Sequence, residues 1–116
     1  MTRPVPAPVV RRVDARHRYE ILVGDTTAGF TAYRDQEGRR VFHHTEIDEA
    51  FAGQGLAATL VREALTDVRA AGKRIVPVCP YVAKYLHKHG DFADITDPVT
   101  PEVLTWLRDR AWQRTS

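Results

Sequence analysis

The sequence predicts an α+β fold, in which an antiparallel meander of strands continues into a β-loop-α-β unit and is followed by an added C-terminal helix. Three patterns carry this prediction. Apolar and polar residues alternate in the first half, apolar residues recur at helical spacing behind two glycines, and a Thr-Pro pair starts a last helix. The chain has 116 residues, of which 43% are hydrophobic, so it can form one small domain with a single core.

The composition excludes several classes of protein. The net charge is +2, which is too small for the footprint of a nucleic-acid-binding protein. No stretch reaches the roughly 18 apolar residues of a membrane span, and the first residues lack the apolar core of a signal peptide. A single cysteine allows no internal disulfide and suits a reducing compartment. We therefore expect a cytoplasmic monomer or weak dimer with no membrane or nucleic-acid partner.

The sequence pattern of the first part of the chain predicts an extended arm that is followed by strands. Prolines at alternating positions predict a flexible, extended arm over residues 1–8. A strand-like region follows, in which RYEILV at residues 18–23 predicts a half-buried strand. Two further strands are expected at residues 29–33 and 40–47, on either side of a turn at residues 35–38. These spacings indicate an antiparallel meander.

The second part of the chain changes to helical spacing. Apolar residues recur three and four positions apart over residues 55–72, which predicts an amphipathic helix that ends at Gly72. A short strand at residues 75–78 is expected to pair in parallel with the 40–47 strand. Pro77 cannot donate to a ladder, so it marks an edge, a bulge or the point where two strands part.

Two helices are expected after this strand. A short one covers residues 81–88, and the last one begins with Thr100 as its cap and Pro101 at its first position. The apolar face of the last helix is predicted to hold Val103, Leu104, Leu107 and Ala111. The expected organisation is the arm at residues 1–8, one domain at 9–97, and a C-terminal helix at 98–116 packed on that domain.

A glycine-rich loop precedes the long helix. The first turn of a helix carries unpaired N–H groups and the positive end of the helix dipole. Glycines before it let a phosphate approach the backbone. Gly53-Gln54-Gly55-Leu56-Ala57 therefore predicts an anion site, or else only a tight turn into a core helix. It has the spacing of neither a Walker loop nor a dinucleotide fingerprint.

The order of strand, glycine loop, amphipathic helix, strand and short aromatic helix resembles the GNAT superfamily of N-acetyltransferases. Their acetyl-CoA loop has the form Arg/Gln-x-x-Gly-x-Gly/Ala, which this chain matches at Gly55 and Ala57 but not at Ala52. A small single-domain GNAT-like subfamily resembles the chain over about residues 19–95. The motifs that carry this resemblance are His44-Thr45-Glu46, Gly53-x-Gly55 and Pro77-x-Cys79-x-Tyr81.

The resemblance implies that acetyl-CoA binds between the 40–47 and 75–78 strands, which would splay apart. The pantetheine arm would pair with exposed strand backbone as an added strand does, and the pyrophosphate would lie on the loop amides. The residues expected to bind the cofactor are Ile47, Gly53, Gln54, Gly55, Leu56, Ala57 and Cys79. The implied activity is acetyl transfer to an unidentified amine, either a small molecule or a protein lysine. The alternative is a non-catalytic acyl-CoA-binding or interaction module, which the departure at Ala52 favours.

Two candidates for the chemistry lie on the 40–47 strand. Alternation places Phe42, His44 and Glu46 on one face of this strand, with His43 and Thr45 on the other. His44 can titrate near neutral pH and act as a base, or it can be a hydrogen-bonded structural histidine. Both residues are therefore candidate catalytic groups, with Glu46 beside His44.

Two further candidates are Cys79 and Tyr85. Cys79 can accept the acetyl group, line the pocket or be an inert buried thiol. In the first case, His44 on the neighbouring strand or the start of the helix near Tyr81 would activate it. The resemblance implies a tyrosine on the short helix that protonates the coenzyme thiolate, and Tyr85 is the candidate, unless it only packs. His87 and His89 lack the rest of a ligand set, so no metal site is predicted.

Overall fold

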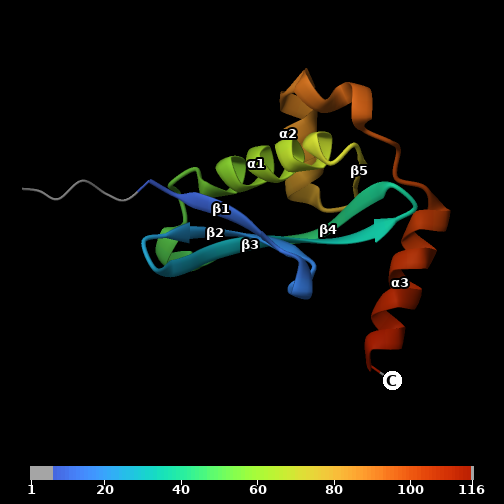
Figure 1. Ribbon diagram of the computed structural model, residues 1–116, viewed down its shortest axis with the longest axis horizontal. Helices are drawn as coiled ribbons and strands as arrows, with labels where there is room; N and C mark the ends of the chain where they lie inside the picture. Colours follow the sequence, from blue (N-terminus) through green and yellow to red (C-terminus); the bar gives the residue numbers. More distant parts are fainter. Residues whose placement is uncertain (1–6, 116) are drawn as a thin grey trace, which may run out of the picture.

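A five-stranded sheet in the order β1-β2-β3-β4-β5 forms the centre of the molecule (Figure 1). The computed structural model describes residues 7–115, with side chains for residues 7–109. Most of the predicted 1–8 arm, and the side chain of Ala111, lie outside this part of the chain. The strands are β1 Val9–Val13, β2 Arg18–Val23, β3 Thr26–Gln36, β4 Arg39–Ile47 and β5 Arg74–Pro77. The α-helices are α1 Leu56–Ala70, α2 Pro80–Lys88 and α3 Pro101–Thr115, and three short 3-10 turns are η1 Asp14–Arg16, η2 Glu49–Phe51 and η3 Gly90–Ile95.

The meander predicted from the sequence is confirmed and is longer than predicted. Strands β1 to β4 pair antiparallel in succession, and β4 pairs with β5 in parallel. The sequence patterns did not predict β1, which precedes the expected 18–23 strand and which η1 separates from β2. Strand β3 reaches Gln36, so the turn narrows to Glu37 and Gly38, both with positive φ. Pairing with β4 holds the extra residues of β3 in the sheet.

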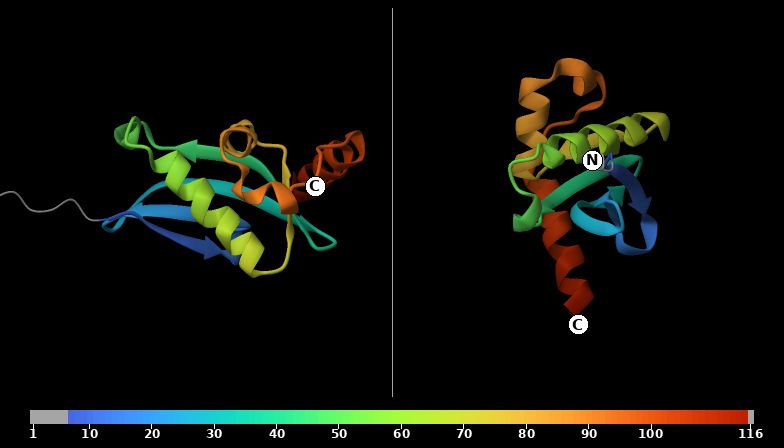
Figure 2. Two further views of the ribbon diagram at one scale, coloured as in Figure 1. Left: turned by 90° about the horizontal axis from the view of Figure 1, so that it is seen from above. Right: turned by 90° about the vertical axis from the view of Figure 1, so that its left-hand side faces the viewer.

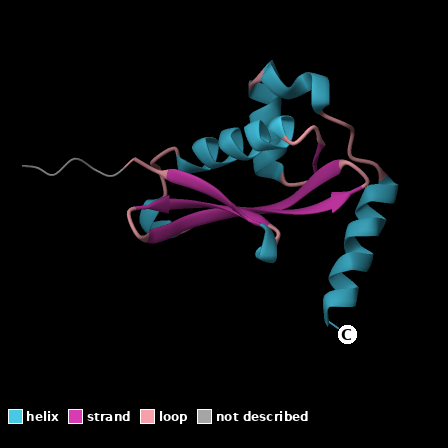
Figure 3. Ribbon diagram, in the orientation of Figure 1, coloured by secondary structure: helices cyan, strands magenta, loops and turns pink. Residues whose placement is uncertain are grey.

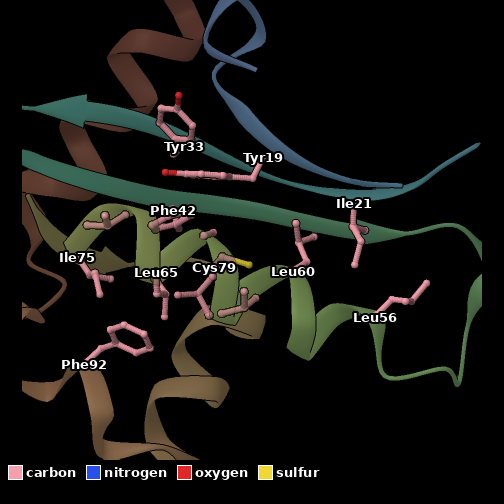
Figure 4. Close-up of a cluster of buried hydrophobic side chains, with 14 of the residues drawn as sticks. Tyr19, Ile21, Tyr33, Phe42, Leu56, Leu60, Leu65, Ile75, Cys79 and Phe92 are labelled. Atoms are coloured by element: carbon pink, nitrogen blue, oxygen red, sulfur yellow. The ribbon is translucent and has the colours of Figure 1, made fainter. Parts of the chain in front are cut away.

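The helices α1 and α2 lie on one face of the sheet (Figures 2 and 3). Helix α1 follows Gly55 and stops just before Gly72, two glycines with positive φ, as the sequence predicts. Its buried face consists of Leu56, Leu60, Val61, Ala64, Leu65 and Val68. These residues pack on sheet residues such as Tyr19, Ile21 and Phe42 (Figure 4). The main core therefore lies between α1 and the sheet. None of the described helices is both long and apolar enough to cross a bilayer.

The last helix, α3, packs on the opposite face of the sheet at its β4–β5 end. Val103 is buried against Val41 and Val76, and Trp106 and Leu107 pack around them. Thr100 Oγ1 accepts a hydrogen bond from the Val103 amide at 3.3 Å, which confirms the predicted cap. Leu104 is 48% exposed, so its place on the predicted apolar face is wrong. The rest of this sheet face, which we call the open face, has no helix over it among the described residues.

Two bulges change which side chains share a face of the sheet. Ala28 is an extra residue in β3 opposite β2, and His43 is an extra residue in β4 opposite β3. Because one extra residue reverses the alternation, Phe42 lies on the helix face and His44 on the open face. The prediction that Phe42 shares a face with His44 and Glu46 is therefore wrong.

A buried arginine ties three strands together at the turn end of the sheet. The Arg40 side chain is 5% exposed and donates two hydrogen bonds to Asp35, at 2.8 and 3.0 Å. It also donates to Tyr19 Oη at 2.6 Å and lies 4.1 Å over the Tyr33 ring. Burial by itself lowers the pKa of Arg40, but the bonds to Asp35 and Tyr19 outweigh it and hold the pKa above its ordinary value. This guanidinium therefore stays charged inside the fold.

Candidate functional site

The strands β4 and β5 part about halfway along β4. Their parallel pairing covers only four residues of each strand and ends at Phe42 and Pro77. The Cys79 amide still donates to the Phe42 carbonyl at 2.8 Å, and then α2 leads the chain away from β4. Pro77 is the last residue of β5, so the interpretation that it marks the point of parting is confirmed. The second half of β4 is thus left without β5 beside it.

The glycine loop lies at the start of α1, next to this opening. Gly53 and Gly55 have φ of 80° and 72°, and a Cβ at either position would meet no atom within 4 Å. The backbone conformation, and not lack of space, therefore requires glycine there. The Thr59 amide donates to the Gly55 carbonyl, so the amides between them belong to the unpaired first turn of the helix. These backbone amides can donate hydrogen bonds to an anion, so the site does not need a basic side chain.

A groove of about 240 Å³ runs between α1 and α2. We call it the helix groove, and it is lined by Ala57, Ala58, Val61, Tyr81, Lys84, Tyr85, Lys88 and His89. Apart from tyrosines, its ionisable side chains are two lysines and one histidine. The helix groove begins at the first turn of α1, so the loop amides and the two lysines offer one continuous surface for a negatively charged ligand.

A second pocket of about 460 Å³ lies beside the ends of β3 and β4. We call it the strand pocket, and it is lined by residues 27–30 of β3, residues 45–48 and Tyr81. Its charged groups are two carboxylates, Glu46 and Asp48. Gly29 lies under it, and a Cβ there would stand 2.5 Å from the Glu46 carbonyl oxygen. This pocket therefore has the opposite charge to the helix groove.

Tyr81 forms a wall of both cavities. It is the second residue of α2 and is 52% exposed. A ligand in the helix groove and one in the strand pocket would therefore meet at this side chain. The sequence brings Tyr81 into the Pro-x-Cys-x-Tyr motif but does not show that it divides two cavities of opposite charge.

His44 and Glu46 lie together on the open face, as alternation predicts. His44 Nε2 is 3.0 Å from Glu46 Oε1, and both side chains are more than half exposed. The His44 ring also packs 5.8 Å from the Phe30 ring. Glu46 lines the strand pocket, so this pair lies beside it.

Cys79 lies on the other face of the sheet. It is 1% exposed within the main core (Figure 4), and its Sγ donates to Thr45 Oγ1 at 3.1 Å. Thr45 Oγ1 in turn lies 2.9 Å from Thr31 Oγ1 in a second buried hydrogen bond. Since Thr45 and His44 point to opposite faces, His44 does not lie beside Cys79, and the predicted activation of Cys79 by His44 is wrong.

Tyr85 lies on the groove side of α2, one turn after Tyr81. It is half-buried, and its ring lies tilted against the His89 ring with 4.4 Å between the ring centroids. Burial is the main reason why the pKa of Tyr85 is raised. The phenol therefore keeps its proton at neutral pH and can donate it. The described residues include no group of three metal-ligating side chains that could hold a metal ion.

The remaining cofactor candidates divide between the two cavities. Ile47 lines the strand pocket, and Ala57 lines the helix groove. Gln54 is exposed in the loop, whereas the Leu56 side chain is buried, so only the Leu56 amide is available. Sequence analysis missed Lys84 and Lys88. Their spacing with Tyr81 and Tyr85 would have placed all four on one helix face.

Sequence analysis also missed Phe30 and Asp48 of the strand pocket. Phe30 reaches it because β3 pairs with β4 directly opposite Glu46, and no local pattern shows this pairing. Asp48 lies just after β4, where its Oδ1 also accepts a hydrogen bond from the Ala50 amide. The sequence signal that could have identified Asp48 is an acidic residue directly after a predicted strand.

Comparison with known proteins agrees with this geometry. A family model described as GCN5-related N-acetyl-transferase matches residues 18–95, which span β2 to η3. The solution structure of a GCN5-like candidate N-acetyltransferase from Staphylococcus aureus has a similar fold, with a TM-score of 0.61 and 16% sequence identity over 80% of this chain and 91% of that chain. No curated protein matches the sequence. The family match covers most of the chain, including the glycine loop and both cavities, and the chain therefore belongs to the GCN5-related N-acetyltransferase family.

Proposed function

We propose that this protein transfers the acetyl group of acetyl-CoA to an amine. The observation that carries the proposal is the parting of β4 and β5 between two cavities of opposite charge that share Tyr81. An anionic coenzyme fits the helix groove, and a cationic amine fits the strand pocket. The reacting groups would then meet at the opening between the strands.

The residues present fit acetyl-CoA. The amides at the start of α1 suit its pyrophosphate, and Lys84 and Lys88 add positive charge farther along the groove. The free edge of β4 suits the amides of the pantetheine arm. Acetyl-CoA, when bound, supplies the acetyl group as a thioester. The acetyl-CoA loops that this loop resembles carry an arginine or glutamine where this chain has Ala52. Here the backbone amides alone would hold the phosphates.

Three side chains support the proton transfers that the reaction needs. An ammonium acceptor must lose a proton before it can attack, and the Glu46 carboxylate, paired with His44, is placed at the strand pocket to take it. Tyr85 lines the helix groove with its proton retained, so its Oη can give that proton to a departing thiolate. We propose these as the roles of Glu46, His44 and Tyr85.

The test of this proposal is turnover. Purified protein is incubated with acetyl-CoA and a panel of diamines, amino-acid amides and lysine peptides, while free coenzyme thiol and acceptor mass are followed. We expect thiol release to depend on the acceptor, with one acetyl group gained by the amine. If acetyl-CoA binds in calorimetry but no amine is acetylated, the protein is instead an acyl-CoA-binding module.

We expect the Cys79→Ser variant to keep its turnover within about threefold of the wild type, which is less than 1 kcal/mol. The contacts support an inert buried thiol, because Cys79 lies in the main core, lines neither cavity and donates to Thr45, and a serine hydroxyl can make the same bond. The measurement is kcat with a saturating amine, with Cys79→Ala as a comparison that removes the donor. A loss of about 100-fold or more in Cys79→Ser would instead indicate that Cys79 carries the acetyl group.

A further inference from the structure

A third charged cavity lies at the turn between β1 and β2. It has a volume of about 470 Å³ and is lined by Ala15, Arg16, His17, Arg18 and Arg34, and we call it the arginine cleft. Three of its five lining residues are arginines, which are always charged, and none is acidic. Arg16 is exposed on η1, whereas Arg34 reaches the cleft from β3. The cleft therefore suits an anionic group.

The arginine cleft and the strand pocket lie on one continuous surface. The Arg18 guanidinium, held by Glu20 at 2.6 Å, lies 4.5 Å over the Phe30 ring. Phe30 in turn lines the strand pocket and packs against His44. Alternation along β3 places Phe30 and Arg34 on the same open face, about 13 Å apart at a rise of about 3.3 Å per residue. A surface that attracts anions thus adjoins one that attracts cations.

We propose that the acceptor is a lysine in an extended protein segment that also carries an acidic residue about four positions away. The lysine enters the strand pocket beside Glu46, and the acidic side chain enters the arginine cleft beside Arg16 and Arg34. This inference rests on the acetyltransferase activity proposed above and adds the class of acceptor to it. It explains why the charges on the open face are separated into two sites.

Other occupants fit this surface less well. A small diamine fills the strand pocket but does not span the distance to the cleft. A nucleic acid suits the arginines but brings a phosphate, and no cation, to the carboxylates of the strand pocket. A peptide with both charges complements both sites, and its attraction to the arginines of the cleft should weaken as salt is added.

The test compares two short peptides that differ only in charge. Each has one central lysine; the first has glutamate about four residues to either side, and the second has glutamine there. We expect the glutamate peptide to have about tenfold higher kcat/KM at low salt, and the ratio to shrink as salt rises. Arg16→Ala/Arg34→Ala should bring the ratio close to one without changing turnover of the glutamine peptide. Lys73→Ala/Arg74→Ala, which removes two positive charges outside the arginine cleft, should leave the ratio unchanged.

A binding measurement without acetyl-CoA separates this proposal from the proposed reaction. Fluorescence anisotropy with the labelled glutamate peptide should show tighter binding than with the glutamine peptide, and Arg16→Gln alone should weaken it if the double variant does not fold. If no amine is acetylated, the acetyltransferase proposal fails, while the anisotropy still decides on the cleft. Equal binding of both peptides, a preference that survives loss of the arginines, or tighter binding of a single-stranded oligonucleotide than of the glutamate peptide would overturn the inference.

Discussion

The Gly55→Val variant is expected to bind acetyl-CoA about 100-fold more weakly than the wild type, a loss of about 2.7 kcal/mol. Gly55 caps α1 with a φ of 72°, which a β-branched residue adopts only with strain. The valine side chain would also stand where the phosphates approach the loop amides. Both effects weaken the contact between the phosphates and the loop amides. Calorimetric titration should therefore show a large loss of affinity for acetyl-CoA.

A matched control is available at the other end of α1. Gly72 has a φ of 70°, and a Cβ there would also meet no atom within 4 Å. Gly72→Val should therefore lower the free energy of unfolding by about 1–2 kcal/mol, as the backbone strain of Gly55→Val should. Unlike Gly55→Val, it should leave the affinity for acetyl-CoA unchanged. If a folded Gly55→Val protein binds as tightly as Gly72→Val, the loop does not hold the coenzyme.

The Arg40→Met variant is expected to lower the free energy of unfolding by about 3 kcal/mol. Methionine fills the space of the side chain but leaves Asp35 without its two hydrogen bonds and Tyr19 Oη without one donor. The measurement is urea unfolding at neutral pH, followed by circular dichroism. Because this network lies at the turn end of the sheet, away from the helix groove, acetyl-CoA affinity should not change in the folded variant.

The neighbouring arginine provides the control for this result. Arg39 is on the same strand, but its side chain is about a third exposed and its ion pair with Asp97 is 3.9 Å long. Arg39→Met should cost less than about 1 kcal/mol, as exposed ion pairs do. Equal losses in the two variants would mean that the burial of Arg40 does not matter for stability.

Several parts of the candidate site could be predicted from local sequence. Two glycines before apolar residues at helical spacing predicted the loop that starts α1. The unpaired amides of a first helical turn and the positive φ of the glycines depend on neighbouring residues alone. Pro77 indicated the parting of β4 and β5, because a missing N–H is a property of the residue itself. The faces of α1 and β2 followed from periodicity for the same reason.

The relations between distant residues could not be predicted in this way. One extra residue, His43, reverses the faces of β4 and separates His44 from Phe42 and Cys79. The strand pocket needs β3 opposite β4, and the arginine cleft needs Arg34 beside the turn at Arg16. Local patterns account for β2 to β5, the three α-helices, their order and the loop that starts α1, because these depend on contacts within a few residues. Which charged side chains share a cavity could not be predicted, because strand register and bulges set those distances across the sheet.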